Sequence, residues 1–135
     1  MLKHWLASEA VMRALALALG QDETRWALAG LLHDLDVELT NADLAVHGRE
    51  TVRILNEHGI DPEIVDAIRL HNEEAFRGEK RSTIFQHALA AGSRDGRHVA
   101  RLPVQAAVRE PGERRGFHLL GRYAEGIRDP DLATW

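Results

Sequence analysis

Residues 29–36 read Ala-Gly-Leu-Leu-His-Asp-Leu-Asp, and this stretch joins an apolar helical pattern to a histidine and two acids. Apolar residues recur at helical spacing through it, and Asp22 is placed to cap the helix that they form. The apolar positions of this helix are Trp26, Leu28, Leu31, Leu32 and Leu35. The sequence therefore predicts a helix that carries His33 and Asp34 to its C-terminal end.

Similar patterns lie on both sides of this stretch and predict four more helices. Their expected starts are Leu2, Thr40, Asp61 and Ser82. Gly20 is placed as a C-terminal cap of the first, Thr40-Asn41-Ala42-Asp43 resembles a capping box, and Asp61-Pro62 combines a cap with proline at the first helical position. The helix that opens at Thr40 is expected to end near Gly59. Since no run alternates over a strand's length, we expect an all-α fold with about five core helices.

Composition narrows the classes of protein to which the chain can belong. It has 135 residues, eight histidines and no cysteine, with a formal net charge of −4. The absence of cysteine excludes thiol catalysis, iron–sulfur clusters and cysteine-bound zinc. The mild acidity argues against a nucleic-acid partner, and no apolar stretch is long enough for a membrane span. We therefore expect a cytoplasmic protein with no nucleic-acid or membrane partner.

The chain changes character near residue 93. Residues 1–92 hold nine basic and fifteen acidic residues, whereas residues 93–135 hold eight arginines, no lysine, three prolines and five glycines. We expect a helical body over 1–92 and a divergent, less regular C-terminal segment over 93–135, in the same domain or trailing from it. A basic segment beside an acidic body is compatible with pairing between chains, so a homo-oligomer is a candidate assembly.

The His33-Asp34 pair at the end of an apolar helix, combined with His4, His47 and His71 on separate helices, indicates a metal site. Adjacent residues on a helix point about 100° apart, so one cation bound by both side chains fits best where the helix ends. The negative end of the helix dipole also favours a cation there. Imidazole and carboxylate together suit manganese, iron, cobalt or zinc better than calcium or magnesium. A carboxylate can bridge two such ions, which makes Asp34 the natural centre of a site for one or two divalent metals.

These motifs together resemble the HD-domain superfamily of metal-dependent phosphohydrolases, whose pattern is His…His-Asp…Asp on an all-α core. Lys3-His4 resembles the first histidine of that pattern, and residues 29–36 resemble its central motif. His47-Gly48 and the stretch from Ala67 to Glu74, which contains His71, resemble the two extra histidines of the subset with two metals. The resemblance covers about residues 1–92. It implies that His4, His33 and Asp34 hold one metal, and that Asp34 bridges to a second held by His47 and His71.

The chain departs from the family pattern at its last ligand. The family carries an aspartate on the fifth helix, and Gly92 stands at that position in Leu89-Ala90-Ala91-Gly92-Ser93. Asp95 follows three residues later on the same helix face. One helical turn displaces it by about 5 Å, which is large against the tolerance of a metal bond. Either Asp95 partly replaces the ligand or the first metal site lacks it.

Further polar residues lie next to the predicted ligands. Asp36 and Glu38 could hold or deprotonate the attacking water, or be solvated acids at a helix end. Arg77, Lys80 and Arg81 form a basic loop that could grip phosphate, or be an ordinary solvated charge run.

The resemblance implies a metal-dependent phosphohydrolase that uses metal-activated water on a small phosphate ester, with a nucleotide as the expected substrate. The sequence is compatible with two alternatives. Gly92 is compatible with a degenerate member that binds metal or nucleotide without turnover, and some similar two-metal proteins are di-iron oxygenases.

Overall fold

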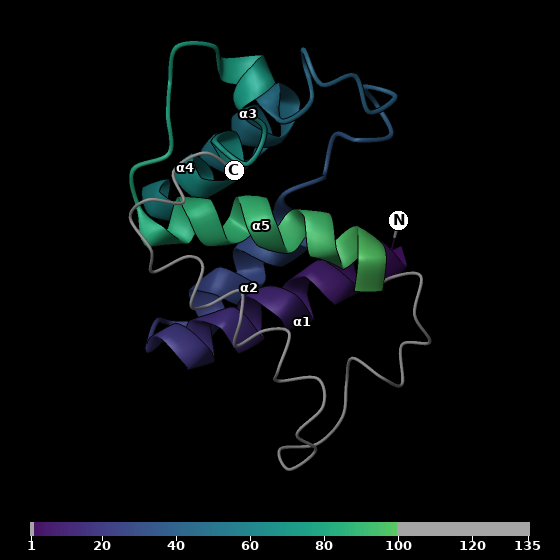
Figure 1. The fold of residues 1–135 in the computed structure, drawn as a ribbon. Helices are drawn as coiled ribbons and strands as arrows, with labels where there is room; N and C mark the ends of the chain where they lie inside the picture. Colours follow the sequence, from purple (N-terminus) through teal and green to yellow (C-terminus); the bar gives the residue numbers. More distant parts are fainter. Residues whose placement is uncertain (1, 100–135) are drawn as a thin grey trace.

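The computed structural model describes residues 2–99, and side chains through residue 93. This part of the chain holds five α-helices and one short 3₁₀ helix, with no strand in it. The elements are α1 (Leu2–Leu19), α2 (Glu23–Leu32), α3 (Arg49–Glu57), α4 (Pro62–Arg69), a 3₁₀ turn (Glu73–Phe76) and α5 (Ile84–Val99). The predicted all-α fold with five helices is confirmed (Figure 1).

An apolar centre forms where α1, α2, α4 and α5 meet. Met12, Leu15, Ile68 and Leu89 are at most 1% exposed. Trp26 of α2 stacks on Phe85 of α5 with ring centroids 5.1 Å apart. Figure 1 shows α5 running alongside α1 in the opposite direction. These contacts fix the helix ends that carry the predicted ligands.

Three of the predicted helix boundaries follow local sequence signals. Gly20 adopts a φ of +65° just after α1, and the Gln21 N–H donates to the Ala16 carbonyl across it. Asp22 accepts from the Arg25 N–H at the start of α2, and Asp61 accepts from the Glu63 N–H at the start of α4. These ends are set by residues within a few positions of each boundary.

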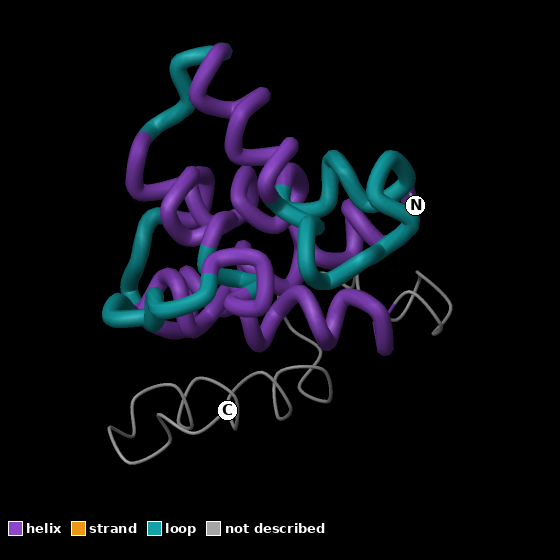
Figure 2. Tube along the Cα trace, turned by 90° about the horizontal axis from the view of Figure 1, so that it is seen from above, coloured by secondary structure: helices purple, strands orange, loops and turns teal. Residues whose placement is uncertain are grey.

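The predicted helix start at Thr40 is wrong. Residues 33–48 form a series of turns, and α3 begins only at Arg49. Asn41 and Ala42 adopt positive φ values, which a right-handed helix cannot include, and the Thr40 hydroxyl donates back to the Asp36 carbonyl. Figure 2 shows this irregular segment as the loop that joins α2 to α3.

The boundary expected near residue 92 falls inside a helix, since α5 continues to Val99. Residues 100–135 lie outside the described part of the chain, so the division into 1–92 and 93–135 stays a prediction. No helix among residues 2–99 is long and apolar enough to cross a membrane.

Candidate metal centre

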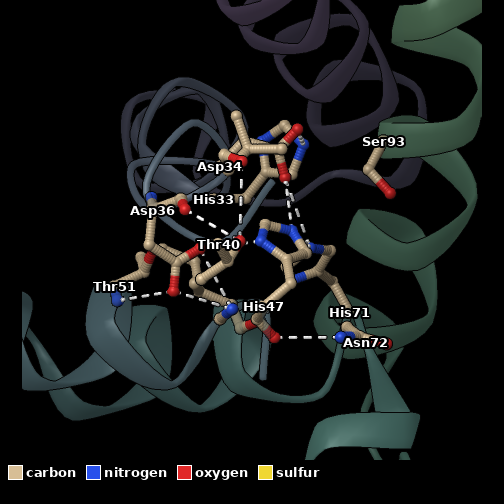
Figure 3. Close-up of polar contacts among 12 residues, drawn as sticks. His33, Asp34, Asp36, Thr40, His47, Thr51, His71, Asn72 and Ser93 are labelled. Carbon is tan, nitrogen blue, oxygen red and sulfur yellow. Dashed lines mark hydrogen bonds and ion pairs between the residues drawn. The ribbon is translucent and has the colours of Figure 1, made fainter. Parts of the chain in front are cut away.

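Asp34 lies among four imidazole rings, of which those of His33, His47 and His71 are labelled in Figure 3. Its Oδ2 atom is 2.9 Å from His4 Nε2 and 3.2 Å from His33 Nε2. Its Oδ1 atom is 2.9 Å from His47 Nε2 and 3.5 Å from His71 Nε2. We call these five residues the histidine–aspartate cluster. Each carboxylate oxygen of Asp34 thus faces a different pair of histidines.

Two groups within the cluster have the composition and spacing of metal ligands. His4, His33 and Asp34 form one group, and Asp34, His47 and His71 form the other, with the ligand atoms of each group within 4.8 Å of one another. Metal bonds of about 2.0–2.2 Å place tetrahedral ligand atoms roughly 3.3–3.6 Å apart. The contacts in the cluster, from 2.9 to 3.5 Å, are close to that spacing. The residues therefore fit one or two divalent cations, with Asp34 common to both groups.

The cluster is assembled from the ends of four helices. His4 lies in the first turn of α1, His33 caps the C-terminus of α2, His47 precedes the start of α3, and His71 follows α4. Asn72 donates from Nδ2 to the carbonyl of His47 at 2.9 Å, which ties the end of α4 to the irregular segment (Figure 3). A site built this way depends on how the helices pack.

Gly30 allows α1 and α2 to approach each other. A Cβ atom at this position would lie 2.5 Å from the backbone oxygen of Ser8 and 2.9 Å from the Met12 side chain. No other residue fits without a shift of α1. The close approach brings His4 Nε2 of α1 to 3.3 Å from His33 Nε2.

Three of the four histidines are oriented through Nδ1. His33 donates from Nδ1 to the Gly30 carbonyl at 2.8 Å, and His71 donates to the Ile68 carbonyl. His47 donates to the Asp36 carboxylate at 2.7 Å. When neutral, His33 and His71 carry their lone pairs on Nε2, directed into the cluster. Lone pairs that face a carboxylate need a cation or a proton between them, which supports the fit to a metal.

Asp36 connects the histidine–aspartate cluster to the start of α3. Its carboxylate accepts from the backbone N–H groups of Gly48, Glu50 and Thr51 at 2.8 to 3.1 Å, while the Thr51 hydroxyl accepts from the Asp36 N–H. Asp36 thus caps α3 from outside the helix, and its side chain is fully buried. No local sequence motif predicts that Asp36 caps α3, because this helix starts more than ten residues after Asp36.

The ionisation of the cluster follows from its contacts. Burial alone would raise the pKa of Asp34, but hydrogen bonds with His33, His4, His47 and His71 hold it far below its ordinary value. Burial would lower the pKa of His47, yet the contacts with Asp34 and Asp36 raise it above its ordinary value. The pKa of His71 is lowered, mainly by burial. Asp34 is therefore a carboxylate, and its negative charge stabilises a proton on His47 or a cation in its place.

The other predicted site residues occupy different surroundings. Glu38 is exposed, as are Arg77 and Lys80 in the loop after the 3₁₀ turn. Arg81 instead donates to the carbonyls of Leu70 and His71 at 2.7 and 3.2 Å. Arg81 therefore supports the backbone of a predicted ligand.

Gly92 faces apolar side chains of α1. A Cβ atom there would lie 2.9 Å from Met12 Sδ and 3.4 Å from Val11 Cγ1, within the apolar contact between α1 and α5. A side chain at this position would enter that contact. Ser93 is buried on α5 and donates to the Ala90 carbonyl, with no polar contact to the cluster drawn in Figure 3. The side chain of Asp95 lies beyond the described ones.

An all-α body with a buried histidine–aspartate cluster at its helix ends defines a candidate metalloprotein. The family model of the HD domain matches residues 1–106 of the chain. The chain therefore belongs to the HD-domain family, which confirms the resemblance drawn from the motifs. Comparisons with curated proteins and with solved structures give no match. Membership of the subset with two extra histidines stays a prediction.

Proposed function

We propose that the chain is a metal-dependent phosphohydrolase that acts on a small phosphate ester, with a nucleotide as the expected substrate. The observation that carries the proposal is the position of Asp34, whose two oxygens face two different pairs of histidines. Such a carboxylate is suited to hold two cations side by side. Bound divalent metals would supply activated water and stabilise the charge of the phosphoryl oxygens.

The remaining residues support this chemistry by position. Asp36 holds the His47 ring and the start of α3, so its role is positioning. Arg81 supports the His71 backbone, which leaves Arg77 and Lys80 as the exposed cations of the loop available to a phosphate group. Glu38 is exposed and available to accept a proton from water.

A binding protein without turnover is the second candidate. Gly92 faces Met12, so position 92 offers the cluster no ligand, and each group of ligands is limited to three described residues. Three protein ligands with open positions are common to catalytic sites, which favours turnover. We therefore prefer hydrolysis to binding without turnover as the proposed function.

The test combines metal content with turnover. Protein purified without added metal is analysed for bound metals, and then assayed with manganese or cobalt against a panel of nucleotides and simple phosphate esters. We expect bound metal and release of phosphate from at least one ester. Asp34→Ala should lose both, whereas the exposed Asp66→Ala on α4 should keep both. Bound metal without turnover across the panel would favour the binding protein, and an oxygen-dependent product with iron would favour an oxygenase.

A further inference from the structure

The two halves of the cluster differ in how their histidines are held. The His47–His71 half consists of Asp34, His47 and His71, and the His4–His33 half consists of His4, His33 and Asp34. Both offer three ligand atoms, so ligand number does not distinguish them. The two halves differ in the hydrogen bonds that the histidines make through Nδ1, the ring nitrogen that points away from Asp34.

Every histidine of the His47–His71 half has an acceptor at Nδ1. His47 donates to the buried carboxylate of Asp36, and that carboxylate is itself fixed by backbone N–H groups of α3. His71 donates to the Ile68 carbonyl, and Arg81 binds the carbonyl of His71. A carboxylate behind a ligating imidazole fixes the ring and raises its basicity, and removing such a partner typically lowers metal affinity about 10- to 100-fold.

His4 has no such partner. Its Nδ1 atom is buried and makes no hydrogen bond within the described residues. A neutral imidazole that binds metal through Nε2 carries its proton on Nδ1, so a metal at His4 leaves a buried N–H without an acceptor. In the other tautomer Nε2 carries the proton and donates it to Asp34 Oδ2 at 2.9 Å. Nε2 then has no free lone pair with which to bind a metal.

We propose that the two halves bind metal with unequal affinity, and that Asp34, His47 and His71 hold the first ion. This inference rests on the proposed metal function of the cluster. The affinity difference expected from the missing partner of His4 is about 10- to 100-fold. In this chain the extra histidines would then hold the tighter site, and the His4–His33 half would fill only at higher metal concentration.

Titration of the metal-free protein with Co²⁺, followed by visible absorption and calorimetry, tests the order of binding. We expect two steps separated by about 10- to 100-fold in dissociation constant. His4→Ala should keep the tight step and lose the weak one. His71→Ala, the matched variant, should lose the tight step. Loss of the tight step in His4→Ala, or two steps of equal affinity in the parent protein, would overturn the proposal.

A second measurement needs no variant and so does not depend on folding. The imidazole ¹⁵N resonances of the parent protein are followed by NMR while diamagnetic Zn²⁺ is added. We expect the Nε2 signals of His47 and His71 to shift with the first equivalent, and that of His4 only with the second. The reverse order contradicts the inference while leaving the metal site intact. An absence of any metal binding refutes the proposed function as well, and two-step binding without phosphate release refutes only the hydrolase assignment.

Discussion

The described part of the chain has two buried centres of opposite chemistry. The apolar centre holds Met12, Leu15, Ile68 and Leu89, and the polar centre holds His33, Asp34, Asp36 and Thr51, all nearly inaccessible to solvent. Apolar contacts have no direction, so the first centre tolerates changes that preserve volume. In the second, each donor depends on one particular acceptor, and loss of one group leaves several others unpaired. The two centres should therefore respond differently to substitution.

The largest expected effect is in the polar centre, at Asp36→Ala. It leaves the His47 Nδ1–H and three backbone N–H groups at the start of α3 without their acceptor. We expect a loss of about 3–5 kcal/mol in the free energy of unfolding, measured with urea, and weaker metal binding. Asp22→Ala removes a cap that serves a single N–H of α2 and should cost only about 1 kcal/mol. Equal losses in the two variants would mean that Asp36 is an ordinary helix cap.

A charge introduced into the apolar centre gives the next largest effect. Gly92→Asp directs a carboxylate at Met12 and Val11, with no donor among those contacts. We expect a loss of about 3 kcal/mol in unfolding free energy and no gain in bound metal. Gly92→Ala adds only a methyl group beside the flexible Met12 side chain and should cost about 1 kcal/mol. A rise in metal content on Gly92→Asp would show that position 92 reaches the cluster after all.

Of the two described centres, only the polar one contains groups whose pKa values are shifted near neutral pH, so it should respond to mild changes of pH. The pKa of His47 is raised because its contacts with Asp34 and Asp36 outweigh the effect of burial, so the metal-free protein keeps its proton above the ordinary value of 6.5. This proton stabilises the metal-free fold below pH 6.5, and that contribution is lost as the pH rises through the raised pKa. The lowered pKa of His71 acts in the opposite sense, since its contribution is lost as the pH falls below 6.5.

A metal that binds His47 must displace the same proton. We therefore expect metal affinity to rise with pH above 6.5, by at most about tenfold per unit, until His47 is neutral. Calorimetry in buffers of different ionisation enthalpy measures the proton released. Asp36→Asn removes one of the two charges that raise the pKa of His47. The pH range over which metal affinity rises should therefore move to lower pH. A flat affinity between pH 6.5 and 8 would contradict the assignment of the proton to His47.

The contrast between the two centres also explains what the sequence could predict. Apolar spacing, Gly20 and Asp61-Pro62 act over a few residues, so the helices around Met12 were predictable. The residues that form the histidine–aspartate cluster were recognisable from the His33-Asp34 motif and its flanking histidines, and their role as metal ligands stays a prediction. The course of residues 33–48 was not, because it depends on contacts such as those from Asp36 to Gly48 and Thr51, which only the folded chain brings together. The Nδ1 atom of His4, which has no hydrogen-bond partner among the described residues, likewise has no signature in the sequence.

The smallest expected effect lies at the start of α5, which contributes to the apolar centre. The sequence pointed to Ser82 as the cap, but Thr83 holds that role, because its Oγ1 accepts from the Gln86 N–H while Gln86 Oε1 accepts from the Thr83 N–H, both at 3.2 Å. Thr83→Ala should therefore lower the free energy of unfolding by about 1 kcal/mol. Ser82→Ala keeps the backbone N–H that donates to Gln86 and should change it by less than about 0.5 kcal/mol. Both variants should bind metal as the parent protein does, since neither side chain belongs to the cluster. A larger loss in Ser82→Ala than in Thr83→Ala would return the cap to the residue that the sequence favoured.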